Sequence, residues 1–129
     1  MIAIDTNVLV RLLTADDAVQ YKASVKLFSS ENIFIPDSVI LEAEWVLRAA
    51  YQLQPRQVAE SLRSVFGLPN VQLHDPQMVA RAINWHETGL DFADAFHLSQ
   101  SQQCTELKTF DTQFIKRGKN LSPCLVQKV

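Results

Sequence analysis

The first residues of the chain decide the fold, and they read Met1-Ile2-Ala3-Ile4-Asp5-Thr6-Asn7. Residues 2–4 form a short apolar run that ends at an acid. Apolar residues then recur at helical spacing, at Val8, Leu9, Leu12 and Leu13. The simplest interpretation is a short strand that passes through Asp5 directly into a helix.

The rest of the chain continues this alternation. Further strands are predicted at residues 33–35, 71–73, 107–110 and 125–126. Helices are predicted to begin near Asp16, Ser38, Pro55, Asp75 and Asp91, and two of them stop at Gly67 and Gly89. Alternating strands and helices predict right-handed βαβ units and a parallel sheet that is covered on both faces. With 129 residues and no linker or repeat, we expect a single domain over residues 1–129.

The composition is that of an ordinary globular protein, with 47% hydrophobic and 20% charged residues. We find neither a signal-peptide pattern nor an apolar run long enough to cross a membrane, so we expect a cytoplasmic protein. Cys104 and Cys124 form no C-x-x-C pair, which argues against a zinc site or a disulfide framework. We expect both to be buried free thiols.

The formal net charge of −2 argues against a protein that holds nucleic acid by a broad cationic surface alone. Metal ions would have to help it bind phosphates. From Lys108 onward the only acid is Asp111, while the bases are Lys108, Lys116, Arg117, Lys119 and Lys128. This tail is either a local basic face or a means of keeping a C-terminal helix soluble.

Two acids directly follow predicted strands. Asp5 comes after residues 2–4, and Asp111 comes after residues 107–110. Ligands of open parallel sheets bind outside the carboxyl ends of the strands, so these two acids indicate one site. The alternative for each is a helix N-cap, which is a common role of aspartate after a strand.

Glu42 is predicted to point inward. On a helix it shares a stripe with apolar residues at three- and four-residue spacing, which are Trp45, Val46, Ala49, Ala50 and Leu53. A carboxylate on a buried stripe requires a cation or strong hydrogen bonds, and burial beside an arginine or a helix N-terminus is the alternative. Glu44 lies off this stripe, and we expect it at the surface, paired with Arg48.

Asp94 lies three residues after Asp91 at a predicted helix start. Capping by Asp91 and the helix dipole acting on Asp94 would explain both acids. Asp94 also shares a face with Ala95, whose small side chain allows a neighbouring element to approach. We therefore count Asp94 as a candidate site residue and leave Asp91 open, as an additional acid or only a cap.

Several carboxylates in one crevice repel each other unless hard cations are bound, which predicts Mg²⁺, or Mn²⁺ as a substitute. Such cations activate water and neutralise phosphodiester oxygens, so hydrolysis of a phosphate ester is the natural reaction. No G-x-S-x-G motif or Gly-rich phosphate loop is present. His74, His86 and His97 lie on different predicted elements, and we assign them no chemistry.

These motifs together resemble those of PIN-domain proteins, particularly the VapC-type ribonuclease toxins of bacterial toxin–antitoxin pairs. The resemblance spans essentially the whole chain. It rests on residues 4–7 (IDTN), Glu42, residues 89–98 (GLDFADAFHL) and residues 108–111 (KTFD).

The resemblance implies a PIN-like three-layer α/β/α sandwich with a central, mainly parallel sheet of about five strands. It implies an endoribonuclease with a magnesium-binding acidic quartet, which comprises Asp5, Glu42, Asp94 and Asp111. Thr6, Asn7 and Thr109 would orient these groups or the substrate. It also implies a homodimer and inhibition by a cognate VapB-type antitoxin. Lys116, Arg117 and Lys119 are then candidate contacts to the RNA backbone.

Three other functions remain open from the sequence. A magnesium-dependent phosphomonoesterase would use Asp5 as a nucleophile and form an aspartyl-phosphate. A receiver-like signalling module would use an acidic pocket without catalysis, although Glu42 and the N-terminal position of Asp5 disfavour it. A PIN-like domain that binds RNA or antitoxin without cleavage is disfavoured by the complete quartet.

Overall fold

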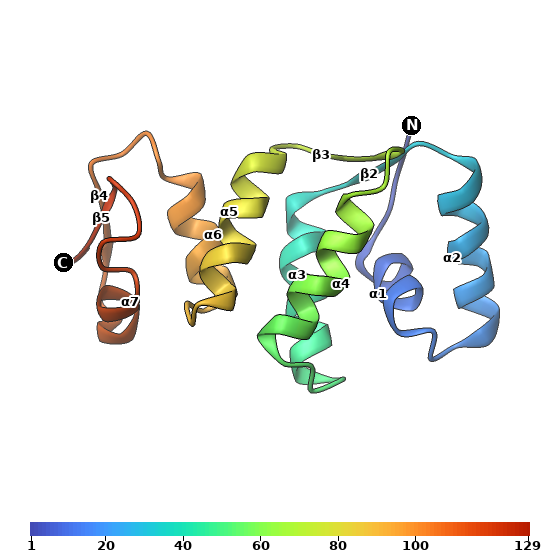
Figure 1. Ribbon diagram of the computed structural model, residues 1–129, viewed down its shortest axis with the longest axis horizontal. Helices are drawn as coiled ribbons and strands as arrows, with labels where there is room; N and C mark the ends of the chain where they lie inside the picture. The colour runs from blue at the N-terminus through green and yellow to red at the C-terminus, as the bar shows by residue number, and fades with distance from the viewer. The chain divides into compact units, whose positions relative to one another are not determined.

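The computed structural model describes all residues from 1 to 129. The chain forms two compact units, Met1–Pro76 and Gln77–Val129, which we call unit 1 and unit 2. Figure 1 labels the helices and strands of both. We describe each unit by itself.

Unit 1 is built around a parallel sheet of three strands in the order β1-β2-β3. Ala3 of β1 lies opposite Phe34 of β2, and Phe34 lies opposite Gln72 of β3. The elements, in chain order, are β1 (Ile2–Ala3), α1 (Thr6–Thr14), α2 (Ala18–Ser30), β2 (Ile33–Ile35), α3 (Asp37–Ala49), α4 (Pro55–Phe66) and β3 (Val71–Leu73).

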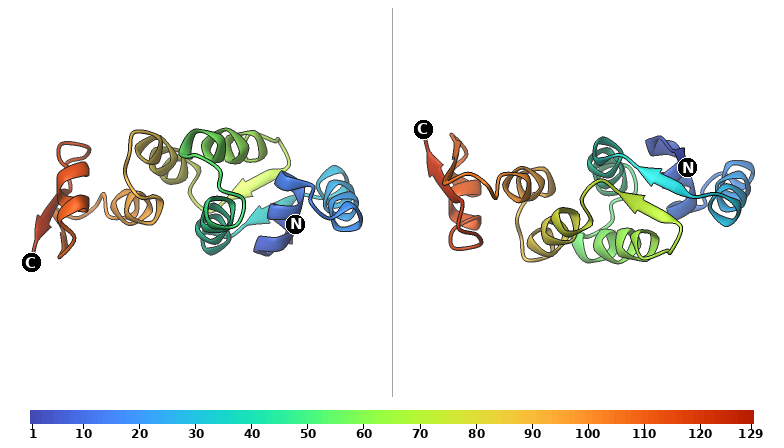
Figure 2. Two further views of the ribbon diagram at one scale, coloured as in Figure 1. Left: turned by 90° about the horizontal axis from the view of Figure 1, so that it is seen from below. Right: turned by 90° about the horizontal axis from the view of Figure 1, so that it is seen from above.

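Helices cover both faces of this sheet. Figure 2 shows α4 on one side of β2 and β3, with α1 and α3 on the other side. The central strand β2 has Ile33 and Ile35 fully buried, as a continuous apolar run predicts. Leu9 of α1, Ile40 of α3 and Leu62 of α4 are equally buried. Both faces of a parallel sheet must be covered, and these residues supply the cover.

Local signals in the sequence set the helix ends of unit 1. The side chain of Asp17 caps α2 by accepting a hydrogen bond from the Gln20 amide (3.0 Å). Pro55 occupies the first position of α4, where proline is favoured because a backbone N–H would have no partner within the helix. Gly67 is the C-cap of that helix. The helix boundaries therefore lie within about two residues of those predicted.

Unit 2 contains the remaining helices and a two-stranded parallel sheet. Its elements are α5 (Pro76–Glu87), α6 (Phe92–Gln100), β4 (Glu106–Thr109), α7 (Thr112–Arg117) and β5 (Leu125–Lys128). The turn between α5 and α6 contains Gly89, whose φ of 120° lies in a region that favours glycine. Phe92 and Phe96 of α6 are buried, and their ring centroids lie 5.7 Å apart. These two rings thus form part of the hydrophobic core of unit 2.

The predicted α/β class and the parallel strand pairing are confirmed. All five predicted strands are present, three of them in the sheet of unit 1 and two in the sheet of unit 2. The longest helices of the structure are too short and too polar to cross a membrane.

Three predictions about burial were wrong. The stripe that begins at Glu42 faces outward, since Glu42 and Trp45 are exposed. Glu44 is instead buried (2% exposed), although its predicted pairing with Arg48 is confirmed at 2.9 Å. The buried face of α3 follows Val39, Ile40, Ala43 and Leu47, because Glu44 can enter this face with its charge paired. Cys124 is a buried free thiol as predicted, whereas the free Cys104 is exposed.

Candidate acidic site

Asp5 lies at the carboxyl end of β1 and caps α1. Its Oδ1 accepts a hydrogen bond from the backbone amide of Val8 at 3.3 Å. The side chain is exposed. The capping role that sequence analysis left open is therefore real, and it fixes where the carboxylate lies without burying it.

Thr6 connects Asp5 to Glu42. The Thr6 side chain is buried, and its hydroxyl donates a short hydrogen bond to Oε1 of Glu42. Because Thr6 directly follows Asp5, this bond joins the Glu42 carboxylate on α3 to the N-terminal end of α1. Glu42 thus lies beside the first acid even though the inward-facing stripe was wrong. The pairing of α1 with α3 makes two acids of unit 1 neighbours.

Three further acids of the candidate site lie in unit 2, and we call them the acidic triad: Asp91, Asp94 and Asp111. Asp91 caps α6, its Oδ2 accepting a hydrogen bond from the Asp94 amide at 3.2 Å. Asp94 occupies the first turn of the same helix and is half-buried. Asp111 caps α7, its Oδ1 accepting from the amide of Gln113 at 2.9 Å.

The acids of the triad repel each other. Burial raises the pKa of the Asp94 carboxyl above its usual value, and the negative charges of Asp91 and Asp111 raise it further. The nearby His97 acts in the opposite direction and lowers this pKa. A carboxylate that is hard to ionise beside two others is a place where a cation would be stabilised.

The remaining predicted residues surround these acids to different degrees. The Thr109 hydroxyl accepts a hydrogen bond from the Asp111 amide at 3.0 Å, so it orients the turn that holds Asp111. Asn7 is exposed next to Thr6. Lys116 and Lys119 are exposed. Arg117 donates to the carbonyl of Gly89 at 3.1 Å, so part of its guanidinium serves to hold α7 to the α5–α6 turn.

The donor set fits a hard cation, because every candidate ligand is a carboxylate oxygen. Within neither unit do three histidine, cysteine or acidic side chains have the arrangement of a complete metal site. The predicted quartet is divided, with Asp5 and Glu42 in unit 1 and Asp94 and Asp111 in unit 2. Each unit thus contains neighbouring acids of its own.

One acid went unnoticed in the sequence. Asp37 follows β2 and begins α3, and its Oδ1 is buried with no hydrogen-bond partner. Leaving a buried carboxylate oxygen without a hydrogen-bond donor is costly, so Asp37 offers a further oxygen to a bound cation. Its sequence signal was the same as that of Asp5, an acid just after a short apolar strand.

The three histidines lie in different segments of the chain. His86 is buried, its Nδ1 lies 2.8 Å from the carbonyl oxygen of Leu90, and its ring packs edge-on against Phe92. His74 and His97 are exposed. His86 therefore stabilises the α5–α6 turn.

Comparison with known families agrees with this order of strands, helices and acids. The sequence profile of the PIN domain family matches residues 2–120, which is nearly the whole chain. The chain belongs to the PIN domain family. PIN domains are generally metal-dependent nucleases, and they usually bind divalent metal ions. Among curated proteins, none matches this chain significantly.

As a PIN domain, the chain has acids at both ends of its family match, from Asp5 to Asp111. The matched region includes residues of both units, so each contributes to the family pattern. The nuclease fold and the set of carboxylate side chains together indicate hydrolysis of nucleic acid. RNA is the substrate that the family suggests.

Proposed function

We propose that this PIN domain is a magnesium-dependent endoribonuclease, which hydrolyses phosphodiester bonds in RNA. The observation that carries the proposal is the acidic triad, in which the pKa of Asp94 is raised by burial and by two neighbouring carboxylates. Such repulsion is tolerated where a divalent cation binds, and oxygen ligands favour Mg²⁺ or Mn²⁺. The family match supports the same chemistry.

In this proposal the cation is held by the acidic quartet of Asp5, Glu42, Asp94 and Asp111, and residues 1–129 act as a single domain. When bound, Mg²⁺ neutralises charge on the phosphate and favours the ionised form of the nucleophilic water. The Thr6 hydroxyl holds Glu42 in place, and Thr109 holds the turn of Asp111. Asn7 is exposed next to Thr6, and in this proposal it orients the substrate.

We further propose that the nuclease is the toxin of a VapBC-type pair. It would act as a homodimer and be neutralised by a cognate VapB-type antitoxin that covers the acidic site. This part rests on the resemblance of residues 4–7, 89–98 and 108–111 to VapC-type toxins. Size-exclusion chromatography with light scattering of the purified protein tests the homodimer directly.

The first experiment measures cleavage of total and transfer RNA by the purified protein with Mg²⁺, with Mn²⁺ and with EDTA. We expect cleavage that requires the metal. Asp5→Asn and Asp94→Asn should each lower its rate by at least about 100-fold, because loss of even an outer contact to a metal site costs about 10- to 100-fold. Isothermal titration with Mg²⁺ should show weaker binding in both variants.

Asp17→Asn is the matched control, because Asp17 caps α2 in the same way that Asp5 caps α1. Asparagine caps helices as well as aspartate does, so this variant should fold and cleave RNA normally. Absence of RNA cleavage by the unmodified protein with either metal would refute the proposal. Release of phosphate from a small monoester, lost in Asp5→Asn, would instead favour the phosphomonoesterase.

A further inference from the structure

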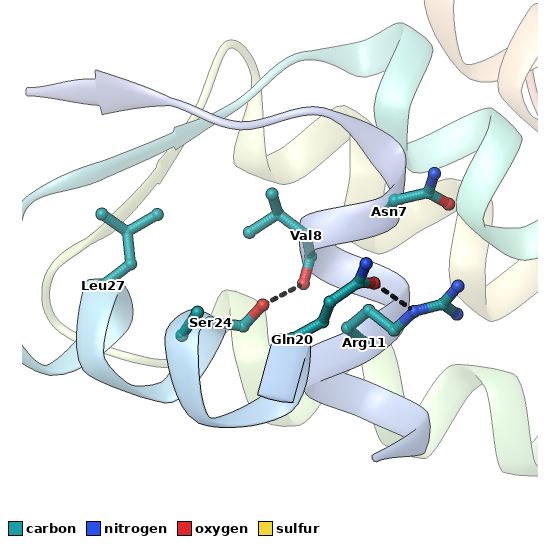
Figure 3. A pocket seen from close by; sticks show the side chains of 7 residues that line it. Asn7, Val8, Arg11, Gln20, Ser24 and Leu27 are labelled. Carbon is teal, nitrogen blue, oxygen red and sulfur yellow. Dashed lines mark hydrogen bonds between the residues drawn. The ribbon is translucent and has the colours of Figure 1, made fainter. Parts of the chain in front are cut away.

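A pocket of about 360 Å³ lies between α1 and α2 in unit 1 (Figure 3). Its apolar lining comes from Val8, Ala23 and Leu27. The Ser24 hydroxyl donates to the carbonyl of Val8 at 3.1 Å and so holds the two helices together along this lining. The volume is in the range of small-molecule sites, which is about 300–1,000 Å³.

Two polar side chains that line the pocket, Arg11 and Gln20, are oriented by hydrogen bonds within the protein. Arg11 donates from Nε to the Gln20 side-chain oxygen at 2.7 Å, and from Nη1 to the Tyr51 hydroxyl at 3.2 Å (Figure 3 shows the first bond). These bonds leave Arg11 Nη2, the Gln20 amide nitrogen and the Asn7 amide without a protein partner. Preorganised donors of this kind favour a ligand with acceptor atoms.

The charge of the pocket argues against a phosphate as its occupant. Arg11 pairs with Asp16 at 3.1 Å, so its positive charge is already offset. A neutral site with an apolar lining and fixed donors instead suits an uncharged, flat group that carries carbonyl or ring-nitrogen acceptors. A nucleobase has these properties, and asparagine, glutamine and arginine side chains are those that read base edges.

The pocket also adjoins the candidate acidic site. Asn7 lines it and lies two residues after Asp5 at the start of α1. An α-helix rises about 1.5 Å per residue, so the pocket begins within about one helical turn of that acid. We infer that the α1–α2 pocket binds the base of an RNA nucleotide next to the scissile phosphate. This inference rests on the proposed ribonuclease function and adds a base-binding subsite to it.

The test is steady-state cleavage of a short RNA whose cut site has been mapped with the unmodified protein. Ala23→Leu fills the pocket at an exposed helix position and should raise KM about 10-fold with little change in kcat, because the base can no longer enter the pocket. Gln20→Ala should act in the same direction. Ala18→Leu, an equally exposed position of α2 outside the pocket, is the control and should leave KM unchanged.

The same RNA with an abasic nucleotide beside the cut site provides the second arm. The abasic site should raise KM for the unmodified protein. It should not raise the KM of Ala23→Leu any further, because the abasic site and the substitution remove the same contact between base and pocket. Equal KM values for Ala23→Leu and Ala18→Leu, or additive effects of the two changes, would overturn the inference while cleavage still supports the ribonuclease. Loss of antitoxin inhibition in Ala23→Leu with unchanged RNA KM would assign the pocket to a peptide. No cleavage by the unmodified protein would overturn both.

Discussion

Asp94 lies in the first turn of α6, where two other carboxylates act on it. Burial raises its pKa most, the charges of Asp91 and Asp111 add to this, and His97 partly compensates. Without metal, ionising Asp94 therefore costs more free energy in the folded protein than in the unfolded chain. A bound cation would convert this repulsion into attraction, which is why the same residue can weaken the metal-free fold and serve the site.

Asp94→Asn is therefore expected to stabilise the protein in EDTA at neutral pH. Asp94 is only half-buried, so solvent partly screens its charge, and the melting temperature should rise by only about 1–3 °C. The pKa of Asp94 is raised in the folded state, so the stability gained by Asp94→Asn reaches its full value above that pKa. It disappears as the pH falls through the raised pKa and Asp94 becomes protonated in the folded state. Thermal melts between pH 3 and pH 8 measure this difference.

Asp17→Asn again serves as the control, because Asp17 lies outside the triad and asparagine preserves the cap that it makes on α2. A melting-temperature gain for Asp94→Asn that grows toward acidic pH would contradict the repulsion in the triad. With Mg²⁺ the order should reverse, because the unmodified protein binds the ion more tightly and therefore gains more stability from it.

At the scale of elements, α7 packs closely on β5 through a glycine. Gly118 is buried and ends α7. A Cβ at this position would lie 2.9 Å from the carbonyl oxygen of Phe114 and 2.9 Å from a methyl group of Val126. The glycine is needed here for space, because its φ of −85° is one that any residue adopts. This contact holds the helix that Asp111 caps against the sheet of unit 2.

Gly118→Ala should therefore destabilise the protein by about 1–3 kcal/mol through overpacking, measured by urea unfolding. Gly67→Ala is the matched control, because Gly67 also ends a helix with a similar φ of −79°, but is exposed. Its added Cβ would lie 3.2 Å from the Arg63 carbonyl. Equal effects of the two substitutions would show that α7 does not need the close approach to β5.

At the scale of the whole molecule, the distribution of charge determines which residues are candidates for electrostatic contacts to RNA. The chain has a net charge of −2, so attraction must come from local bases and from metal. Lys116 and Lys119 are exposed near the end of α7, whereas Arg117 is engaged with Gly89 and Lys108 pairs with Glu106 at 3.2 Å. The two exposed lysines are therefore the better candidates for contacts to the RNA backbone.

Lys116→Glu combined with Lys119→Glu should weaken RNA binding and flatten its salt dependence. Each phosphate contact to a single strand contributes about 0.7 to the slope of log affinity against log salt, so the slope should fall by at least about 1.4. Fluorescence anisotropy at several salt concentrations measures this slope. Mg²⁺ binding should persist, and an unchanged RNA affinity would remove these lysines from the interface.

The sequence by itself determined the elements of this protein and their alternation. Short apolar runs became β1 to β5, and local signals such as Asp17, Pro55 and Gly67 set the helix ends, because capping and backbone preference act within a few residues. It also placed Asp5 and Asp111 at the ends of strands, and the motifs around them identified the PIN family.

Only the tertiary structure decided which side of α3 is buried and which acids are neighbours. Periodicity favoured the Glu42 and Trp45 face, but packing against α1 and α4 chose the face of Ile40 and Leu47 and buried Glu44 with Arg48 as its partner. Glu42 is joined to Thr6 by a hydrogen bond across 36 positions in the sequence. Helical spacing cannot predict such choices, because they depend on the surfaces of elements that are distant in the chain.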